Sequence, residues 1–243
     1  MFIEIKNLTK KFKNTFAVNN INFSIDKNKT LGLLGPNGCG KTTSIGMILG
    51  LIKPTSGEII IDEKNLESFK RNDILARINF ASPYIELPKK LTVRQNLEVY
   101  GRLYGIKNRK ERIEEISEDL GIKDFFDRKT GELSSGQKNR VSLAKSLINK
   151  PEILLLDEPT ASLDPDIGDF VRSYIQDYSL KNKVTILLAS HNMSEVERLC
   201  DSIIMMKSGK IIDRGTCKEI IDRHGRSNLE ETFLKLARSN DEL

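Results

Sequence analysis

The 243-residue sequence predicts an α/β protein with a sheet core and a helical insertion. Three observations lead to this fold class. Short apolar and β-branched stretches typical of strands recur in the first and last thirds of the chain. A glycine-rich loop stands between one of these strands and the expected start of a helix. The stretch from about 84 to 150 instead has the spacing of amphipathic helices, so an α/β core with an inserted helical part accounts for the pattern.

The first third of the chain is read mainly as strands. Two stretches alternate apolar and polar residues with period two, one is a short β-branched run, and one is apolar throughout and leads into the glycine-rich loop. A helix is expected to begin within that loop and to continue through Thr43–Leu51, until Lys53–Gly57, which contains proline and glycine, ends it. The expected strands are Phe2–Lys6, Ile21–Ile25, Thr30–Leu34 and Glu58–Asp62.

The middle of the chain predicts helices, and the last third returns to strand and helix in alternation. Apolar residues at i, i+3 and i+7 occur twice between 84 and 150, which favours amphipathic helices. Gly209 marks a hairpin turn between the last two expected strands. The helical positions are Ile113, Ile116 and Leu120, then Val141, Ala144 and Ile148, and the later strands are Ile153–Leu156, Val184–Ala189, Ser202–Met206 and Lys210–Asp213.

The composition is that of a globular domain, with 30% charged and 38% hydrophobic residues. The longest apolar runs are far shorter than the ~20 residues that cross a bilayer, and the N-terminus has no apolar block of the signal-peptide kind. The net charge of +5 is compatible with nucleic acid or an anionic membrane surface as a partner, but the lysines are scattered, as on a solvated surface. The three cysteines form no paired pattern, which favours a reduced, cytoplasmic setting.

The segment Gly35–Thr42 (GPNGCGKT) fits the phosphate-binding pattern G-x-x-x-x-G-K-[ST]. Its glycines let backbone N–H groups turn toward anionic oxygens, and the helix N-terminus adds a favourable dipole. Lys41 is expected to reach the β- and γ-phosphates of a nucleotide, and the Thr42 hydroxyl to bind Mg²⁺. Cys39 fills a position that only needs to be small, with a redox role as the alternative. The predicted nucleotide-binding residues here are Gly35, Pro36, Asn37, Gly38, Cys39, Gly40, Lys41, Thr42 and Thr43.

Two adjacent carboxylates follow the apolar strand Ile153–Leu156. Asp157 is expected to hold Mg²⁺, directly or through water, and Glu158 to face an attacking water as its general base. Such a pair after a strand is often only a strand end. The phosphate-binding loop in the same chain is what favours a catalytic role.

The string LSSGQ, Leu133–Gln137, precedes a helix expected to continue through Lys138–Ile148. Ser135 and Gly136 offer a hydroxyl, a close backbone approach and a helix N-terminus, which together suit an anion. Taken alone, the same string could be an ordinary helix cap.

Together, the phosphate-binding loop, LSSGQ and ILLLDEP (Ile153–Pro159) resemble the ATP-binding subunits of ABC (ATP-binding cassette) transporters, and the resemblance covers nearly the whole chain. It implies a P-loop NTPase core, in which a RecA-like sheet is joined by an antiparallel β subdomain, plus an inserted α-helical subdomain. ATP and Mg²⁺ are the implied ligands. The expected organisation is a single ATPase domain over 1–243, with its core in 1–83 and 151–225, its helical subdomain in 84–150 and a short C-terminal segment in 226–243.

The resemblance also implies a shared site between two chains. Residues of LSSGQ would contact the γ-phosphate of ATP bound to the opposite subunit, so that two chains sandwich two ATPs head to tail. The stretch Ser162-Leu163-Asp164 resembles the D-loop, which communicates across the dimer. The predicted contacts from this side are Ser134, Ser135, Gly136, Gln137 and Asp164.

Two further residues are interpreted through the resemblance, and a third from its neighbours alone. His191, at the end of the strand Thr185–Ser190, matches the switch histidine that orients the γ-phosphate and water. Phe12 matches the aromatic residue that stacks on adenine, with Phe16 as a near competitor and a core phenylalanine as the alternative. His224, beside Arg223 and Gly225, is read as a surface residue. The predicted catalytic residues are Glu158, His191 and Lys41, and the predicted metal ligands are Thr42 and Asp157.

One position departs from the family pattern. After the strand Ile78–Phe80 these ATPases usually carry a glutamine that touches Mg²⁺ and the attacking water, and this chain has Pro83 there. Proline has neither a side-chain acceptor nor an N–H, so the contact must be lost, supplied by water or made by a neighbour such as Ser82. Because this segment normally also faces the membrane partner, coupling and basal hydrolysis rate depend on it.

The resemblance therefore predicts a transport-coupled ATPase that works as a dimer, expected to be a homodimer, on a separate integral membrane (permease) subunit. The protein would lie peripherally on the cytoplasmic face of the membrane. Export is favoured over import, because the ending Asn228–Leu234 (NLEETFL) resembles that of exporter subunits. No nucleic-acid partner is expected. The alternatives are a soluble ABC ATPase that acts on nucleic acid or ribosomes, and a regulatory cassette with little turnover, which Pro83 keeps open.

Overall fold

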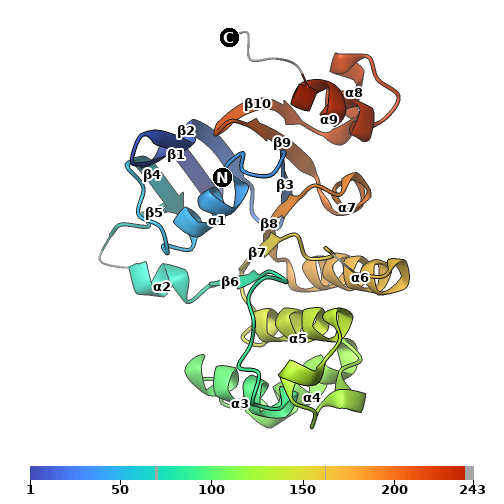
Figure 1. Ribbon diagram of the computed structural model, residues 1–243. Coiled ribbons are helices and arrows are strands. Elements are labelled where there is room, and N and C mark those ends of the chain that lie inside the picture. Colours follow the sequence, from blue (N-terminus) through green and yellow to red (C-terminus); the bar gives the residue numbers. More distant parts are fainter. Residues whose placement is uncertain (69–70, 162, 239–243) are drawn as a thin grey trace. The chain divides into compact units, whose positions relative to one another are not determined.

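The structure, a computed structural model, describes residues 1–68, 71–161 and 163–238. These residues form mixed α/β architecture, as Figure 1 shows. The chain divides into two compact units. Unit 1 consists of Met1–Leu75 and Thr185–Leu243, and unit 2 of Ala76–Val184.

Unit 1 contains an antiparallel sheet built from the first part of the chain. Its strand order is β2 (Thr15–Ile25), β1 (Ile3–Phe12), β4 (Ser56–Ile61) and β5 (Lys64–Asn65). Ile3 pairs with Ile25 on one side and Ile61 on the other, and all three are buried. The alternation that predicted these strands thus marks the face that packs into the core.

The second sheet of unit 1 is centred on β3 (Thr30–Leu34), whose five residues are all buried. β3 lies between β8 (Thr185–Ser190) and β9 (Ser202–Lys207) and is parallel to both. An uninterrupted apolar strand of this kind is typical of a sheet covered on both faces. β10 (Lys210–Gly215) follows β9 as an antiparallel hairpin, in which Ser208 and Gly209 both have positive φ, so the predicted turn is confirmed.

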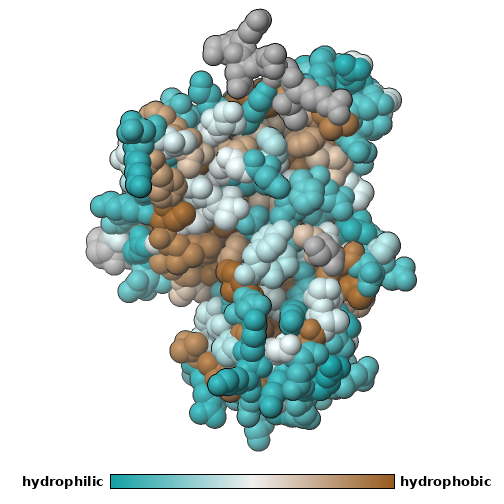
Figure 2. All heavy atoms as spheres, viewed as in Figure 1, coloured by the Kyte–Doolittle hydropathy of each residue, from teal (hydrophilic) through white to brown (hydrophobic). Residues whose placement is uncertain are grey.

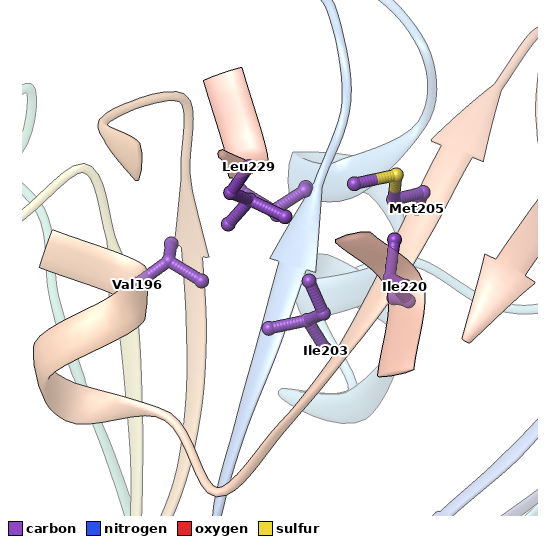
Figure 3. Close-up of a cluster of buried hydrophobic side chains, with 6 residues drawn as sticks. Val196, Ile203, Met205, Ile220 and Leu229 are labelled. Atoms are coloured by element: carbon purple, nitrogen blue, oxygen red, sulfur yellow. The ribbon is translucent and has the colours of Figure 1, made fainter. Parts of the chain in front are cut away.

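Among the described residues of unit 1, these sheets are accompanied by the helices α1 (Lys41–Ile48), α2 (Arg71–Leu75), α7 (Met193–Leu199), α8 (Cys217–His224) and α9 (Leu229–Arg238). The last three pack over β3 and β9 through a buried cluster that joins Leu34 to residues near the end of the chain (Figure 3). The cluster consists of Leu34, Val196, Ile203, Met205, Ile220 and Leu229.

The described residues of unit 2 form two parallel strands and four α-helices. β6 (Ile78–Ala81) pairs with β7 (Ile153–Asp157). The helices are α3 (Val93–Leu103), α4 (Arg109–Asp119), α5 (Ser135–Leu147) and α6 (Pro165–Asn182), with short 3₁₀ turns at Lys123–Phe125 and Thr130–Glu132.

The positions predicted from spacing lie on the buried sides of α4 and α5 or at the C-caps of these helices. Ile113, Ile116 and Leu120 are buried, and so are Val141, Ala144 and Ile148. Figure 1 shows α3, α4 and α5 grouped together. The fourth helix of this unit, α6, comes later in the chain, after β7. Unit 2 thus contains the predicted helical stretch 84–150 together with β6, β7 and α6. The subdomain boundaries at 83/84 and 150/151 stay predictions.

Figure 2 shows hydrophilic side chains interspersed with hydrophobic ones over the visible face. In the described part of the chain no helix has both the length and the hydropathy needed to cross a bilayer. All three cysteines carry free thiols.

Candidate functional site

The phosphate-binding loop of unit 1 has the backbone geometry that its glycines predict. Gly38 and Gly40 have φ values of 79° and 110°, which lie in the left-handed region that favours glycine. A Cβ at Gly40 would lie 2.4 Å from the Ala17 carbonyl oxygen, whereas one at Gly38 would meet nothing within 4 Å. Gly40 is thus required by both strain and close packing against β2, and Gly38 by backbone conformation alone.

Neighbouring elements hold the loop at both sides. The Gly209 N–H donates to the Cys39 carbonyl at 3.0 Å, and the Asn19 N–H donates to the Gly209 carbonyl at 2.8 Å. Within the loop, the Cys39 N–H donates to the Pro36 carbonyl at 3.2 Å. The β9–β10 turn therefore connects the loop to β2.

Lys41 is a buried cation at the N-terminus of α1, with 6% of its surface exposed. Its ammonium donates to the carbonyls of Gly35 at 2.6 Å and Pro36 at 3.2 Å. Gly40 is the N-cap and provides no side chain, so the helix N-terminus faces the loop with its own N–H groups. A buried ammonium, a helix N-terminus and a glycine cradle form a donor set suited to phosphate oxygens.

Cys39 is a packing residue of this loop. Its side chain is 3% exposed, and a Cβ at Gly35 would lie 2.4 Å from its sulfur. Burial raises the pKa of the Cys39 thiol above its ordinary value, although Lys41 acts in the opposite direction. A buried thiol with a raised pKa is a poor nucleophile, so the geometry favours the small-residue interpretation over the redox one.

His191 lies next to the loop by strand register. Leu34 of β3 pairs with Ser190 of β8 in parallel, so Gly35 and His191 both follow the same edge of the sheet. Parallel strands bring ligand-binding residues to this carboxyl edge. His191 is exposed, and the chain turns after it into α7, whose N-cap Asn192 accepts from the Glu195 N–H.

Phe12 and Phe16 lie at the end of the β1–β2 ladder, where Lys11 pairs with Phe16 and Phe12 with Thr15. Their exposed fractions are 48% and 45%, so neither is a core residue, and the core alternative for Phe12 is wrong. Each ring is covered by a lysine, Lys10 over Phe12 at 4.9 Å and Lys11 over Phe16 at 5.0 Å. Both rings are thus exposed aromatic surfaces of the kind that stack on a base, and each has a lysine ammonium close to it.

Unit 2 carries the two carboxylates at the end of β7. Asp157 is its last residue and Glu158 follows it, and both are buried, with 5% and 7% of their surface exposed. Glu158 has a φ of 55°, unusual for a residue with a Cβ. Such a conformation costs of order 1–3 kcal/mol and persists where surrounding structure fixes it, often at functional sites.

The LSSGQ string forms the N-terminus of α5 in the same unit. Ser134 and Gln137 make a reciprocal capping box, with the Gln137 N–H donating to Ser134 Oγ at 3.3 Å and the Ser134 N–H donating to Gln137 Oε1 at 3.0 Å. The cap interpretation thus holds for these two residues. Ser135 is exposed in the first turn, and a Cβ at Gly136 would lie 2.8 Å from Ile167, so Gly136 allows α6 to approach closely.

The remaining predicted positions of unit 2 lie on loops. Asp164 is the N-cap of α6 and makes no side-chain capping bond. Ser162 of the expected D-loop lies outside the described residues. Because Ala81 of β6 pairs with Leu156 of β7, Ser82 and Pro83 follow the same sheet edge as Asp157 and Glu158. Ser82 is buried and is the closest polar neighbour in the chain to the position where the family has glutamine.

Sequence reasoning missed two polar contacts. Asn139 of α5 is 7% exposed and donates through Nδ2 to the Pro159 carbonyl at 2.6 Å. An asparagine inside a helix, where its propensity is poor, was the available signal. His224 was expected at the surface, but its side chain is only 19% exposed and Nε2 lies 2.6 Å from Asp213 Oδ2. That expectation was wrong because β10 provides a partner eleven residues away that spacing does not reveal.

The chain belongs to the ABC transporter family, whose sequence pattern matches residues 18–161. It is 37% identical over 227 residues to the ABC transporter ATP-binding protein NatA of Bacillus subtilis, covering 91% of each chain. It is 35% identical to the Nod factor export ATP-binding protein I of Burkholderia lata, covering 90% of this chain and 72% of that one. It is also 32% identical to the methionine import ATP-binding protein MetN 3 of Shouchella clausii, covering 99% and 73%.

Solved structures agree with this assignment. The ATP-binding subunit of an ABC transporter superposes with a TM-score of 0.88 at 24% identity, covering 98% of this chain and all of that one, which concerns the fold alone. The ATP-binding cassette MJ0796, a dimer bound to ADP and Pi in a post-hydrolysis state, gives 0.81 at 26% identity, covering 88% and 98%. The predicted P-loop NTPase fold is therefore confirmed, and so is the single ATP-binding cassette. ABC cassettes bind ATP, and cassette dimers occur among the similar structures.

Proposed function

We propose that this chain hydrolyses ATP as one of two ATP-binding subunits and thereby powers export through a separate membrane protein, a direction favoured by the exporter-like segment Asn228–Leu234. Two of the relatives named above carry opposite directions in their names, export at 35% identity and import at 32%. The observation that carries the ATPase part is Lys41, a buried ammonium held by two carbonyls inside a glycine cradle at a helix N-terminus.

The phosphates of ATP would be bound by unit 1. The loop N–H groups and Lys41 would neutralise the β- and γ-phosphate oxygens, and the Lys41 carbonyl partners would be exchanged for them. His191, at the same sheet edge, would orient the γ-phosphate and the attacking water. Phe12 would stack on the adenine, with Phe16 one cross-strand position away.

Hydrolysis would depend on Glu158 of unit 2. Its carboxylate would accept the proton of the attacking water while the terminal phosphate bond breaks, giving ADP and inorganic phosphate. Thr42 and Asp157, a hydroxyl and a buried carboxylate, are oxygen ligands of the kind that Mg²⁺ prefers, and the ion would neutralise phosphate charge. Asp157 ends β7 in the strand conformation and Glu158 follows it with a left-handed φ, so two different backbone conformations set the directions of the two side chains.

The second subunit would complete the site. Ser135 and Gly136, at the N-terminus of α5, would contact the γ-phosphate of ATP on the opposite chain, in the head-to-tail arrangement that the family resemblance implies. Ser134 and Gln137 are already engaged in the capping box, so their proposed contribution is to fix the helix start. The dimeric cassette MJ0796 supports the two-chain arrangement.

A surface pocket of unit 2 suits the membrane partner. It has a volume of about 280 Å³ and is lined by Pro83, Tyr84, Ile85, Leu133 and others of this unit. Tyr84 and Ile85 are 72% and 49% exposed, so a large aromatic and a branched apolar side chain stand at its rim. We propose that a permease segment binds here, which would hold the protein at the cytoplasmic face of the membrane.

The proposal is tested by steady-state ATP hydrolysis of the purified chain. Lys41→Ala should abolish turnover through loss of phosphate binding, and Glu158→Gln should keep ATP binding but lower turnover by ~10²–10⁴-fold. A parental rate equal to that of Lys41→Ala would refute the ATPase assignment, and a Glu158→Gln variant at the parental rate would refute the choice of base.

The transport part is tested separately. Tagged Glu158→Gln chain, incubated with ATP in detergent-solubilised native membranes, should recover a multi-span membrane protein that mass spectrometry identifies. Lys41→Ala serves as the control that cannot form the ATP-bound state. Recovery of ribosomal or DNA-associated proteins without an integral membrane protein would refute the transport assignment.

A further inference from the structure

A buried amide connects α5 to the segment that follows Glu158. Asn139 lies two residues after the LSSGQ string, is 7% exposed, and donates from Nδ2 to the Pro159 carbonyl at 2.6 Å. Pro159 is buried as well. A buried carbonyl that loses its donor is left unsatisfied, so this contact is not replaceable by an apolar side chain of equal size.

Two backbone hydrogen bonds of the segment after β7 join residues within the segment itself. The Ala161 N–H donates to the Glu158 carbonyl at 3.0 Å, and the Leu163 N–H donates to the Thr160 carbonyl at 3.3 Å. Both bonds are local, between residues three apart. Asn139 provides a bond from another element, and it reaches the carbonyl of the residue directly after Glu158.

This bond matters because of the backbone conformation of Glu158. Its φ of 55° is one that a residue with a Cβ adopts only when its surroundings fix it. β7 holds the chain before Glu158, so a change of the φ of Glu158 would swing its Cα–Cβ bond and the following residue, Pro159, together. The ring of Pro159 fixes its own φ and leaves little freedom to absorb this rotation. Fixing the Pro159 carbonyl therefore also fixes the direction of the Glu158 side chain.

Asn139 also lines the pocket that contains Pro83, Tyr84 and Ile85. A second, small cavity of about 10 Å³ is bordered by Asn139, Pro83 and Pro159, which places this amide between the segment after β6 and the segment after β7. An occupant of the larger pocket would therefore contact the same residue that holds the Pro159 carbonyl.

We propose that Asn139 is a positioning residue for ATP hydrolysis, which holds the carbonyl of Pro159, the residue after Glu158, and so couples the LSSGQ helix and the pocket at Pro83 to the general base. This inference rests on the proposed function, because it assigns Asn139 a role only through Glu158. Asn139 itself touches no reacting atom in this proposal.

The test compares substitutions that keep the size of the side chain. Asn139→Asp removes the donor with almost no change in shape, and Asn139→Gln keeps an amide on a longer side chain. Asn79 offers a matched control, since it is 4% exposed and its Nδ2 donates to the Ser146 carbonyl at 2.5 Å and to Asn149 Oδ1, away from the segment after Glu158. Asn79→Asp thus removes an equivalent buried bond at the other end of α5.

Asn139→Asp is expected to lower kcat about tenfold or more, while the KM for ATP and the affinity of the monomer for nucleotide stay within about twofold. Asn139→Gln should recover part of that loss. Asn79→Asp should lower the thermal unfolding temperature at least as much as Asn139→Asp, yet leave kcat near the parental value. A purely structural role for Asn139 would move stability in both variants without this split between kcat and KM.

Three results would overturn the inference. The first is a kcat of Asn139→Asp within twofold of the parent, and the second is an equal loss of kcat in Asn79→Asp. The third is an Asn139→Asp chain that does not fold while Asn139→Leu, which also lacks the donor at similar size, folds and has a kcat within twofold of the parent. A parental rate that depends on Lys41 and Glu158 but not on Asn139 refutes only this inference, whereas a parental rate equal to that of Lys41→Ala refutes the proposed function as well.

Discussion

Gly40→Ala should destabilise unit 1 and abolish nucleotide binding together. The new Cβ would lie 2.4 Å from the Ala17 carbonyl oxygen, a backbone atom that cannot turn away, and the residue would have to keep a φ of 110°. Left-handed strain costs about 1–2 kcal/mol for a residue with a Cβ, and forced overlap in a packed region adds about 1–3 kcal/mol. The free energy of unfolding should therefore fall by about 2–5 kcal/mol, a large part of the 5–15 kcal/mol typical of a domain.

The control for this prediction is Gly225→Ala in the same unit. Gly225 is the C-cap of α8 with a φ of 60°, and a Cβ there meets nothing within 4 Å. It should cost only the strain, about 1 kcal/mol, and leave nucleotide affinity unchanged. The assays are urea unfolding followed by circular dichroism and titration with a fluorescent ATP analogue. Equal stability of the two variants, or parental nucleotide affinity in Gly40→Ala, would refute the argument that close packing against β2 fixes the loop.

Four other predictions concern unit 2. Ser134→Ala removes half of the capping box and should lower the free energy of unfolding by about 1 kcal/mol. Ser135 is exposed, so Ser135→Arg should spare stability and nucleotide binding by the monomer but block ATP-driven dimerisation in size-exclusion chromatography. Arg112→Met should cost about 2–4 kcal/mol in urea unfolding, because its buried guanidinium donates to the Leu147 and Ile148 carbonyls, whereas Arg94→Met, which breaks an exposed pair with Asp127, should cost under about 1 kcal/mol. The hydrogen bond from Arg112 lowers the pKa of Glu115 below its ordinary 4.5. The stability that this pair contributes is therefore fully present above pH 4.5 and is lost as the pH falls through the lowered pKa. Glu115→Gln should reduce the loss of stability in acid, and an unchanged dependence of stability on acid pH would contradict this.

The sequence was sufficient for the elements whose pattern is local. The apolar run at Thr30–Leu34 and the hairpin at Gly209 were predicted because burial on both faces and a two-residue turn leave a direct record in residue type. The strand predicted as Phe2–Lys6 is longer in the structure, Ile3–Phe12, because its second half contains polar residues that pair at register shifts with β2. Such irregular pairing depends on the partner strand and leaves no period to detect.

The candidate site divides in the same way. The phosphate-binding loop was predictable because Gly40 and Lys41 are required by conformation and charge at fixed spacing. The contact of Asn139 with Pro159 and the pair of His224 with Asp213 were not predictable, because each joins residues from different elements. The left-handed backbone of Glu158 also has no signal in the sequence, since no glycine or asparagine occupies that position.

The buried cluster around Leu34 has a consequence for the order in which the protein is made. Leu34 lies directly before the phosphate-binding loop, yet it belongs to one buried cluster with Ile220 and Leu229, which are synthesised long after it. Its strand β3 also pairs only with strands that begin at Thr185 and Ser202. Unit 2, by contrast, is continuous in sequence from Ala76 to Val184. Domains fold during synthesis as their residues emerge. Unit 2 can therefore fold while β3, the strand that leads into the nucleotide loop, is still without its partner strands. We expect this unpaired apolar strand to be the segment of the nascent chain most prone to aggregation.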